Sequence, residues 1–125
     1  MNTREKGNKG EDVACTYLRN RGFVIVARNY SRKWGEIDII AKKDTVRHFF
    51  EVKSVASPYS EQADIHKPED NVHGLKVKHI RRMIETYFEE QDGRIDLEFQ
   101  FHVLSVYMNG TTRRAHVEWL KNVIL

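Results

Sequence analysis

The sequence predicts an α/β domain in which helices flank a central sheet that begins with a three-stranded antiparallel meander. Three observations support this fold class. A helical pattern comes first, three short segments rich in β-branched and aromatic residues follow, and a second helical pattern precedes a final pair of strands. The chain has 125 residues, 40% of them hydrophobic and 31% charged, which is enough for one core. We therefore expect a single domain over residues 1–125.

The expected elements follow from periodicity and from turn residues. The first helix is predicted at 10–21 and ends at Gly22, a residue type typical of helix C-terminal caps. Residues 54–74 contain both prolines and no periodicity, so they predict a mobile loop. The other expected elements are strands at 23–27, 35–40 and 49–53, a helix at 75–92, strands at 97–108 and 112–117, and an amphipathic tail at 119–125 packed on the sheet.

Two of the predicted strands carry a carboxylate among large apolar residues, where strands usually carry none. Asp38 lies between Ile37 and Ile39, and Glu51 follows Phe50. If the chain reverses at 44–45, the antiparallel register places Asp38 opposite Glu51, with Cβ atoms roughly 4.5–5.5 Å apart. The two charges repel unless a cation lies between them, and oxygen ligands with room for water suit Mg²⁺ or Mn²⁺. The alternative is an ordinary exposed hairpin, which explains these embedded carboxylates poorly.

Two further residues join this hypothesis. Lys53 lies two residues beyond Glu51, so it projects from the same face, where its ammonium could orient a water or neutralise charge on a phosphate. Glu11 lies on or beside the apolar stripe of the first helix. It is either a third acidic group near the metal or a favourable charge in the first helical turn, and the two interpretations can hold together.

Cations on the second helix lie away from its apolar stripe. Lys76, Arg81 and Arg82 could hold a phosphate backbone against the metal, or form an ordinary solvated face. The net charge of +3 and the pI of about 9.0 permit a nucleic-acid partner without requiring one.

Composition also bounds the expected compartment. Cys15 is the one cysteine, so no intrachain disulfide is possible, and a cytoplasmic location is the expectation. The N-terminus lacks an apolar signal core, and no apolar stretch approaches the roughly 20 residues that span a bilayer. We therefore expect no membrane association.

The motifs together resemble those of a known group of proteins, and the resemblance covers nearly the whole chain. The residues that carry it are Gly10-Glu11 with Ala14, Leu18 and Gly22, then Arg28-Asn29-Tyr30, then Gly35-Glu36-Ile37-Asp38-Ile39-Ile40-Ala41, then Phe50-Glu51-Val52-Lys53, and later Lys76, Ile80, Tyr87-Phe88 and Asn122. This set resembles the PD-(D/E)XK, or restriction-endonuclease-like, superfamily, and most closely its YraN-like family of predicted nucleases. The layout is also similar to that of archaeal Holliday-junction resolvases.

The resemblance implies a restriction-endonuclease-like core with a mixed central sheet. It implies that Asp38, Glu51 and the Val52 carbonyl bind the metal, that Lys53 serves the attacking water, and that Glu11 is an outer acidic partner. The implied activity is hydrolysis of phosphodiesters in DNA, with branched or structured DNA as a candidate substrate. The alternative is a nucleic-acid-binding module that keeps the nuclease fold but cuts little or not at all. A symmetric junction would suit a two-fold homodimer, although the sequence shows no dimer interface.

Overall fold

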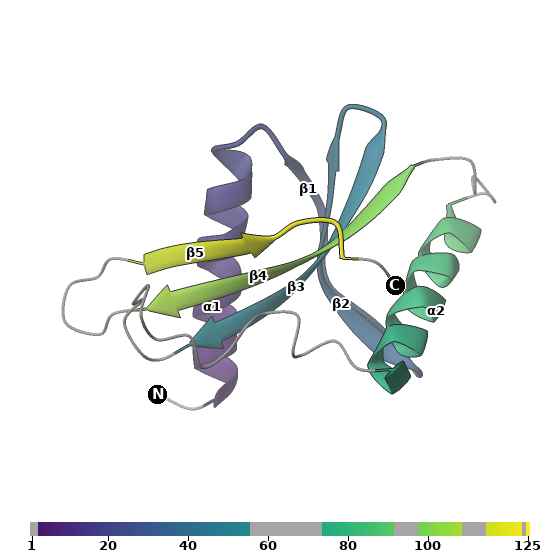
Figure 1. The fold of residues 1–125 in the computed structure, drawn as a ribbon, viewed down its shortest axis with the longest axis horizontal. Coiled ribbons are helices and arrows are strands. Elements are labelled where there is room, and N and C mark those ends of the chain that lie inside the picture. The colour runs from purple at the N-terminus through teal and green to yellow at the C-terminus, as the bar shows by residue number, and fades with distance from the viewer. Residues whose placement is uncertain (1–2, 56–73, 92–97, 109–114, 124) are drawn as a thin grey trace.

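The computed structural model describes residues 3–55, 74–91, 98–108, 115–123 and 125, which form a mixed five-stranded sheet with two helices (Figure 1). The strands are ordered β1-β2-β3-β4-β5, and every neighbouring pair is antiparallel except β3 and β4. The predicted α/β class with a mixed sheet is confirmed, and the arrangement is compatible with a restriction-endonuclease-like core. The elements are α1 (Thr3–Arg19), β1 (Val24–Arg32), β2 (Gly35–Lys43), β3 (Val46–Val55), α2 (Gly74–Glu90), β4 (Phe99–Met108) and β5 (Ala115–Leu120).

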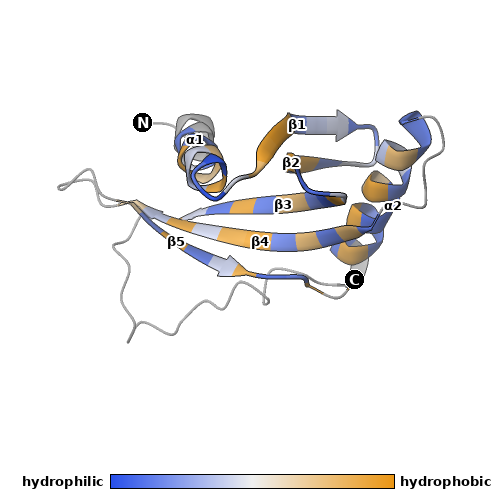
Figure 2. Ribbon diagram, turned by 90° about the horizontal axis from the view of Figure 1, so that it is seen from above, coloured by the Kyte–Doolittle hydropathy of each residue, from blue (hydrophilic) through white to orange (hydrophobic). Residues whose placement is uncertain are grey.

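The two helices cover opposite faces of the sheet. Successive strand residues point to opposite sides, so neighbouring residues of one strand pack against different helices. Phe50 packs in a cluster with Leu18 of α1, whereas its neighbour Phe49 packs in a second cluster with Tyr87 and Phe88 of α2. Figure 2 shows the hydrophobic bands along β3 and β4, the strands that contribute to both clusters. Each helix therefore closes its own half of the hydrophobic core.

Helix α1 begins at Thr3, so the predicted start at Gly10 is wrong. Gly10 lies inside the helix because α1 packs closely against β3 there, and a Cβ on Gly10 would overlap Ser54 Oγ. This packing outweighs the poor helix propensity of glycine. The predicted cap is confirmed: Gly22 has φ 88, and the Gly22 and Phe23 N–H groups donate to the carbonyls of Arg19 and Leu18.

The β2–β3 hairpin has the predicted register over five pairs. It reverses at Asp44, which has φ 57, and its ladder runs from Lys43 opposite Val46 to Ile39 opposite Phe50. The ladder ends there, one pair short of Asp38 and Glu51.

The C-terminal half differs from the prediction at its ends. Strand β5 runs from Ala115 to Leu120, so Trp119 belongs to a strand paired with Leu104 of β4 rather than to an amphipathic tail. Of the predicted loop at 54–74, Ser54 and Val55 belong to β3 and Gly74 begins α2, while residues 56–73 lie outside the described part. Neither described helix is long and apolar enough to cross a membrane.

A buried pair of histidines holds the chain that follows β5 on the sheet. The Asn122 N–H donates to His102 Nδ1 at 2.9 Å, so His102 carries its proton on Nε2 and donates it to His48 Nδ1 at 2.8 Å. Burial, and then the neighbouring charges of His48 and Lys121, lower the pKa of His102 to about 3. His102 therefore stays neutral, burial also lowers the pKa of His48, and both rings pack in the core.

Candidate functional site

The candidate site lies where β2 and β3 separate. Beyond Ile39 and Phe50, β2 continues against β1, and β3 continues against β4 (Figure 1). The Asp38 side chain fills the gap at this fork, because its Oδ2 accepts a hydrogen bond of 2.7 Å from the Val52 N–H. Asp38 thus takes the place of a ladder carbonyl, which is why the expected pairing of Asp38 with Glu51 does not form.

A pocket of about 170 Å³ opens at the fork. Two of the predicted metal ligands, Asp38 and Glu51, line it together with Lys76 from the first turn of α2. Glu36 adds a third carboxylate to the same pocket. Its apolar walls are Ile37, Phe50, Ile80 and Phe101.

Asp38 has the most perturbed carboxyl group among the described residues. Burial raises the pKa of Asp38 from 3.8 to about 7, and the hydrogen bond from the Val52 N–H offsets only part of that rise. The negative charges of Glu11, Glu51 and Glu36 raise the pKa of Asp38 further. The carboxylates of α1, β2 and β3 therefore repel one another at the fork; they are those of Glu11, Glu36, Asp38 and Glu51.

Glu11 reaches this point from the other side of the sheet. Its side chain is only 9% exposed, and its Oε1 has no hydrogen-bond partner. Burial raises the pKa of Glu11, while the Arg28 charge and a hydrogen bond from Asn29 lower it. The close approach of α1 at Gly10 brings the adjacent Glu11 to the fork.

Glu51 is only half satisfied. Its Oε1 forms an ion pair with Lys76 Nζ, whereas its Oε2 is buried without a hydrogen-bond partner. Lys53 lies two residues farther along β3, opposite Ser105 of β4, and is half-buried. It shares the face of Glu51 by strand alternation but does not line the pocket.

The two arginines predicted with Lys76 do not reach the pocket. Arg82 is exposed and stacks on the Trp34 ring, with its Cζ 4.1 Å from the ring centroid. Arg81 is also exposed and borders a separate groove of about 420 Å³ between α2, the start of β4 and the residues after β5.

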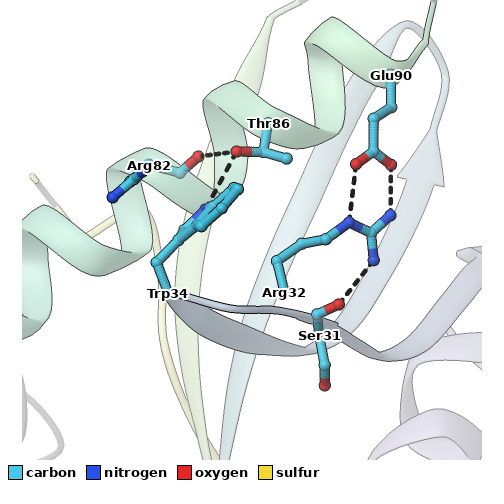
Figure 3. A network of polar contacts seen from close by, with 6 residues as sticks. All are labelled: Ser31, Arg32, Trp34, Arg82, Thr86 and Glu90. Atoms are coloured by element: carbon cyan, nitrogen blue, oxygen red, sulfur yellow. Dashed lines mark hydrogen bonds and ion pairs between the residues drawn. The ribbon is translucent and has the colours of Figure 1, made fainter.

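A polar network holds the turn before Glu36 against α2 (Figure 3). Arg32 pairs with Glu90 through two hydrogen bonds of 2.8 and 2.5 Å. Trp34 Nε1 donates to Thr86 Oγ1 at 3.3 Å. Gly35 lies close to α2, since a Cβ there would lie 3.1 Å from Met83 Cγ. The network therefore fixes the pocket wall that carries Glu36.

Sequence reasoning missed the roles of Arg28 and Asn29. Arg28 forms an ion pair of 2.8 Å with Asp12 and lies close enough to lower the pKa of Glu11. Asn29 has φ 52, a left-handed conformation that asparagine tolerates better than most residues. The sequence signal was the Arg28-Asn29-Tyr30 motif of the resemblance, which indicates no partner for either residue.

The donors at the fork suit a hard divalent cation that keeps some of its water. Among the residues that the structure describes, no group of three or more His, Cys, Asp or Glu side chains is arranged to hold a metal ion alone. Mg²⁺ is usually bound through one or two carboxylates plus water and substrate phosphates, so Asp38 and Glu51 meet that requirement. The unpartnered oxygens of Glu11 and Glu51 are the groups that such an ion or its water would satisfy.

Fold and site together define an α/β domain with an acidic pocket at the fork of a mixed sheet. The chain belongs to the family described as "Uncharacterised protein family UPF0102", whose model matches residues 10–106. A UPF0102 protein of Campylobacter lari is 44% identical over 101 residues, covering 81% of this chain and 82% of the relative. One of Caldicellulosiruptor saccharolyticus is 34% identical over 122 residues, covering 98% of each chain. One of a Sulfurovum species is 36% identical over 121 residues, covering 95% of this chain and 93% of the relative.

Proposed function

We propose that this protein is a metal-dependent endonuclease that hydrolyses phosphodiester bonds in DNA, with Mg²⁺ or Mn²⁺ as its cofactor. The observation that carries the proposal is the convergence of Asp38 and Glu51 in one pocket, where burial and mutual repulsion hold the Asp38 pKa near 7. Such an arrangement costs stability, and strongly perturbed groups in a pocket mark candidate active sites. The resemblance to the PD-(D/E)XK nucleases assigns the same two residues to metal binding.

Each residue has a defined part in this proposal. The Asp38 and Glu51 carboxylates and the Val52 carbonyl would hold the metal, which when bound supplies a Lewis acid for the phosphate and its attacking water. The Val52 N–H orients Asp38 by its hydrogen bond. Lys53, on the face of Glu51, would hold the water or offset charge on the phosphate. Glu11 would bind the outer water of the site through its unpartnered oxygen.

Substrate binding is assigned to the α2 side of the pocket. Lys76 lines the pocket, and the exposed Arg81 and Arg82 follow on the same helix. These cations can contact phosphates without reading bases, which agrees with recognition of DNA shape, such as a branch or junction. A symmetric junction would engage a homodimer, and we place the activity in the cytoplasm, where Cys15 stays reduced.

A cleavage assay tests the proposal. Linear, flapped and four-way DNA would be incubated in Mg²⁺ or Mn²⁺ with the wild type, Asp38→Asn, Glu51→Gln and the control Glu89→Gln, which changes an exposed carboxylate of α2. Loss of either ligand should lower the cleavage rate by about 100-fold or more, the scale of losing one electrostatic group in an active site. The control should cut at the wild-type rate.

Two results would contradict the proposal. Cleavage that persists unchanged in both ligand variants would place the chemistry elsewhere. Salt-sensitive DNA binding by the wild type, with no metal-dependent product on any substrate, would establish the alternative of a nucleic-acid-binding module that does not cut.

A further inference from the structure

Lys76 occupies a position that helix electrostatics disfavour. It is the third residue of α2, in the turn where the partial positive charge of the helix repels cations, and that turn contains no acidic residue. A lysine in this turn therefore needs a partner outside the helix. The structure supplies one, because Lys76 Nζ forms an ion pair with Glu51 Oε1 across the pocket.

The two partners differ in their freedom to move. The Lys76 side chain is 43% exposed and Glu51 is 22% exposed. The ammonium can withdraw into water along its flexible stem, whereas Glu51 is fixed on β3 with its Oε2 buried and unpartnered. If the pair separates, Lys76 is solvated at once, but Glu51 is left as a half-buried charge with a buried Oε2 that another cation would stabilise.

The lining of the pocket defines which cation that is. Three carboxylates, those of Glu36, Asp38 and Glu51, share one ammonium there. When Asp38 is ionised, as it is when it binds a metal ion, three negative charges and one positive charge leave a net charge of minus two. An ion of charge plus two that replaces the ammonium at Glu51 balances these carboxylates better than the ammonium does.

We propose that Lys76 is the resident counter-ion of Glu51, and that a divalent metal ion displaces its ammonium from that carboxylate. This inference rests on the metal site of the proposed function. It assigns Lys76 a role that the sequence did not indicate. Before substrate binds, the Lys76 ammonium competes with the metal ion for Glu51 and so lowers the metal affinity. The displaced ammonium stays at the mouth of the pocket, where a phosphate ligand gives it a new anionic partner.

The test is a calorimetric titration of Mn²⁺ into the wild type and three variants without nucleic acid. Lys76→Met removes the competing cation and should bind Mn²⁺ about twofold to fivefold more tightly, as expected for loss of one partly exposed ion pair. Lys76→Arg keeps a cation and should bind with an affinity near that of the wild type. Lys78→Met is the matched control, because it removes the same charge at an exposed position of the same helix.

Thermal unfolding supplies a second readout. Without metal, Lys76→Met should melt below the wild type, because Glu51 loses its partner. Saturating Mn²⁺ should then raise its melting temperature by more than it raises that of the wild type. Lys78→Met should show neither effect.

The outcomes separate this inference from the proposed function. If the wild type binds Mn²⁺ and Lys76→Met binds it with equal or weaker affinity, the counter-ion role is wrong while the metal site stands. If no variant binds Mn²⁺, the metal site itself is wrong, and the counter-ion role with it. Binding by Lys76→Met alone would support displacement in its strongest form.

Discussion

Asp38 is the residue at which folding and the proposed chemistry oppose each other. Its carboxylate is taken from water, placed near Glu11, Glu36 and Glu51, and given one backbone hydrogen bond in return. The resulting pKa of about 7 means that ionising Asp38 costs the folded protein free energy at neutral pH. A bound divalent ion would offset that cost.

The first prediction concerns Asp38→Asn in metal-free buffer. The amide oxygen can still accept the Val52 N–H, but no charge is buried, so the variant should be more stable than the wild type. The Asp38 pKa is higher in the folded state than in the unfolded state, so the folded wild type binds the extra proton between about pH 4 and pH 7. Wild-type stability therefore falls as the pH rises through that range.

The advantage of Asp38→Asn should thus be absent near pH 4 and complete above pH 7. Its size should be on the order of 2–4 kcal/mol, from about 1.4 kcal/mol for each unit of pKa shift. Urea unfolding at pH 4, 6 and 8 measures it, with the exposed turn variant Asp44→Asn as the control. If Asp38→Asn is no more stable than the wild type at pH 8, ionised Asp38 does not destabilise the folded protein, and the prediction is wrong.

The sequence alone identified the site residues that are distinguished by their neighbours in the chain. Asp38 and Glu51 were recognisable because each is a charge flanked by large apolar residues of its own strand. Their partners could not be recognised from the sequence. The hydrogen bond from Val52 to Asp38 and the ion pair of Lys76 with Glu51 join segments that only the fold brings together. Lys76 was assigned to phosphate binding, and its ion pair with Glu51 could be seen only in the structure.

At the scale of elements, the contact of α1 with β3 positions one corner of the site. Gly10 lets the helix touch Ser54, and the next residue, Glu11, is thereby held near Asp38. The sequence pattern placed the helix start at Gly10, whereas α1 begins at Thr3 and Gly10 lies inside it. Its reason for being there, a close helix–strand approach, depends on a strand more than 40 residues away.

The second prediction tests this contact. Gly10→Val should lower the free energy of unfolding by about 1–3 kcal/mol, the usual cost of overpacking, because its side chain has no room beside Ser54. Chemical denaturation measures the loss. Thr16→Val, which places the same side chain at an exposed position of α1, is the control. Equal stability of the two variants would mean that α1 can move away from β3 without cost.

The fork between β2 and β3 is the second feature that a local pattern could not supply. The hairpin register followed from its turn and proved correct from Lys43 to Ile39. Beyond Phe50, β3 loses β2 and keeps only β4, a parallel partner about 50 residues later in the chain that pairs with β3 from Arg47 to Val55. Pairing between strands so far apart in the sequence depends on the tertiary structure, so the hairpin sequence alone does not predict it.

At the scale of the whole molecule, the site lies between two hydrophobic clusters. The α1 cluster contains Ile39 and Phe50, and the α2 cluster contains Ile37 and Phe101. Asp38 is inserted between members of both, so charges on α1 and near α2 meet around one carboxylate. The fold class and the strand composition were predictable from periodicity. The domain extent of 1–125 and the proposed loop stay predictions, since residues 56–73 lie outside the described part.

The most direct test of the central claim is X-ray diffraction from crystals grown with saturating Mn²⁺, recorded near the manganese absorption edge. We expect one strong anomalous peak in direct contact with the carboxylates of Asp38 and Glu51, with the Lys76 ammonium no longer on Glu51. Crystals of Asp38→Asn grown in the same solution should lose the peak. No peak at the fork of the wild type, with Lys76 still paired to Glu51 at saturating Mn²⁺, would contradict the account.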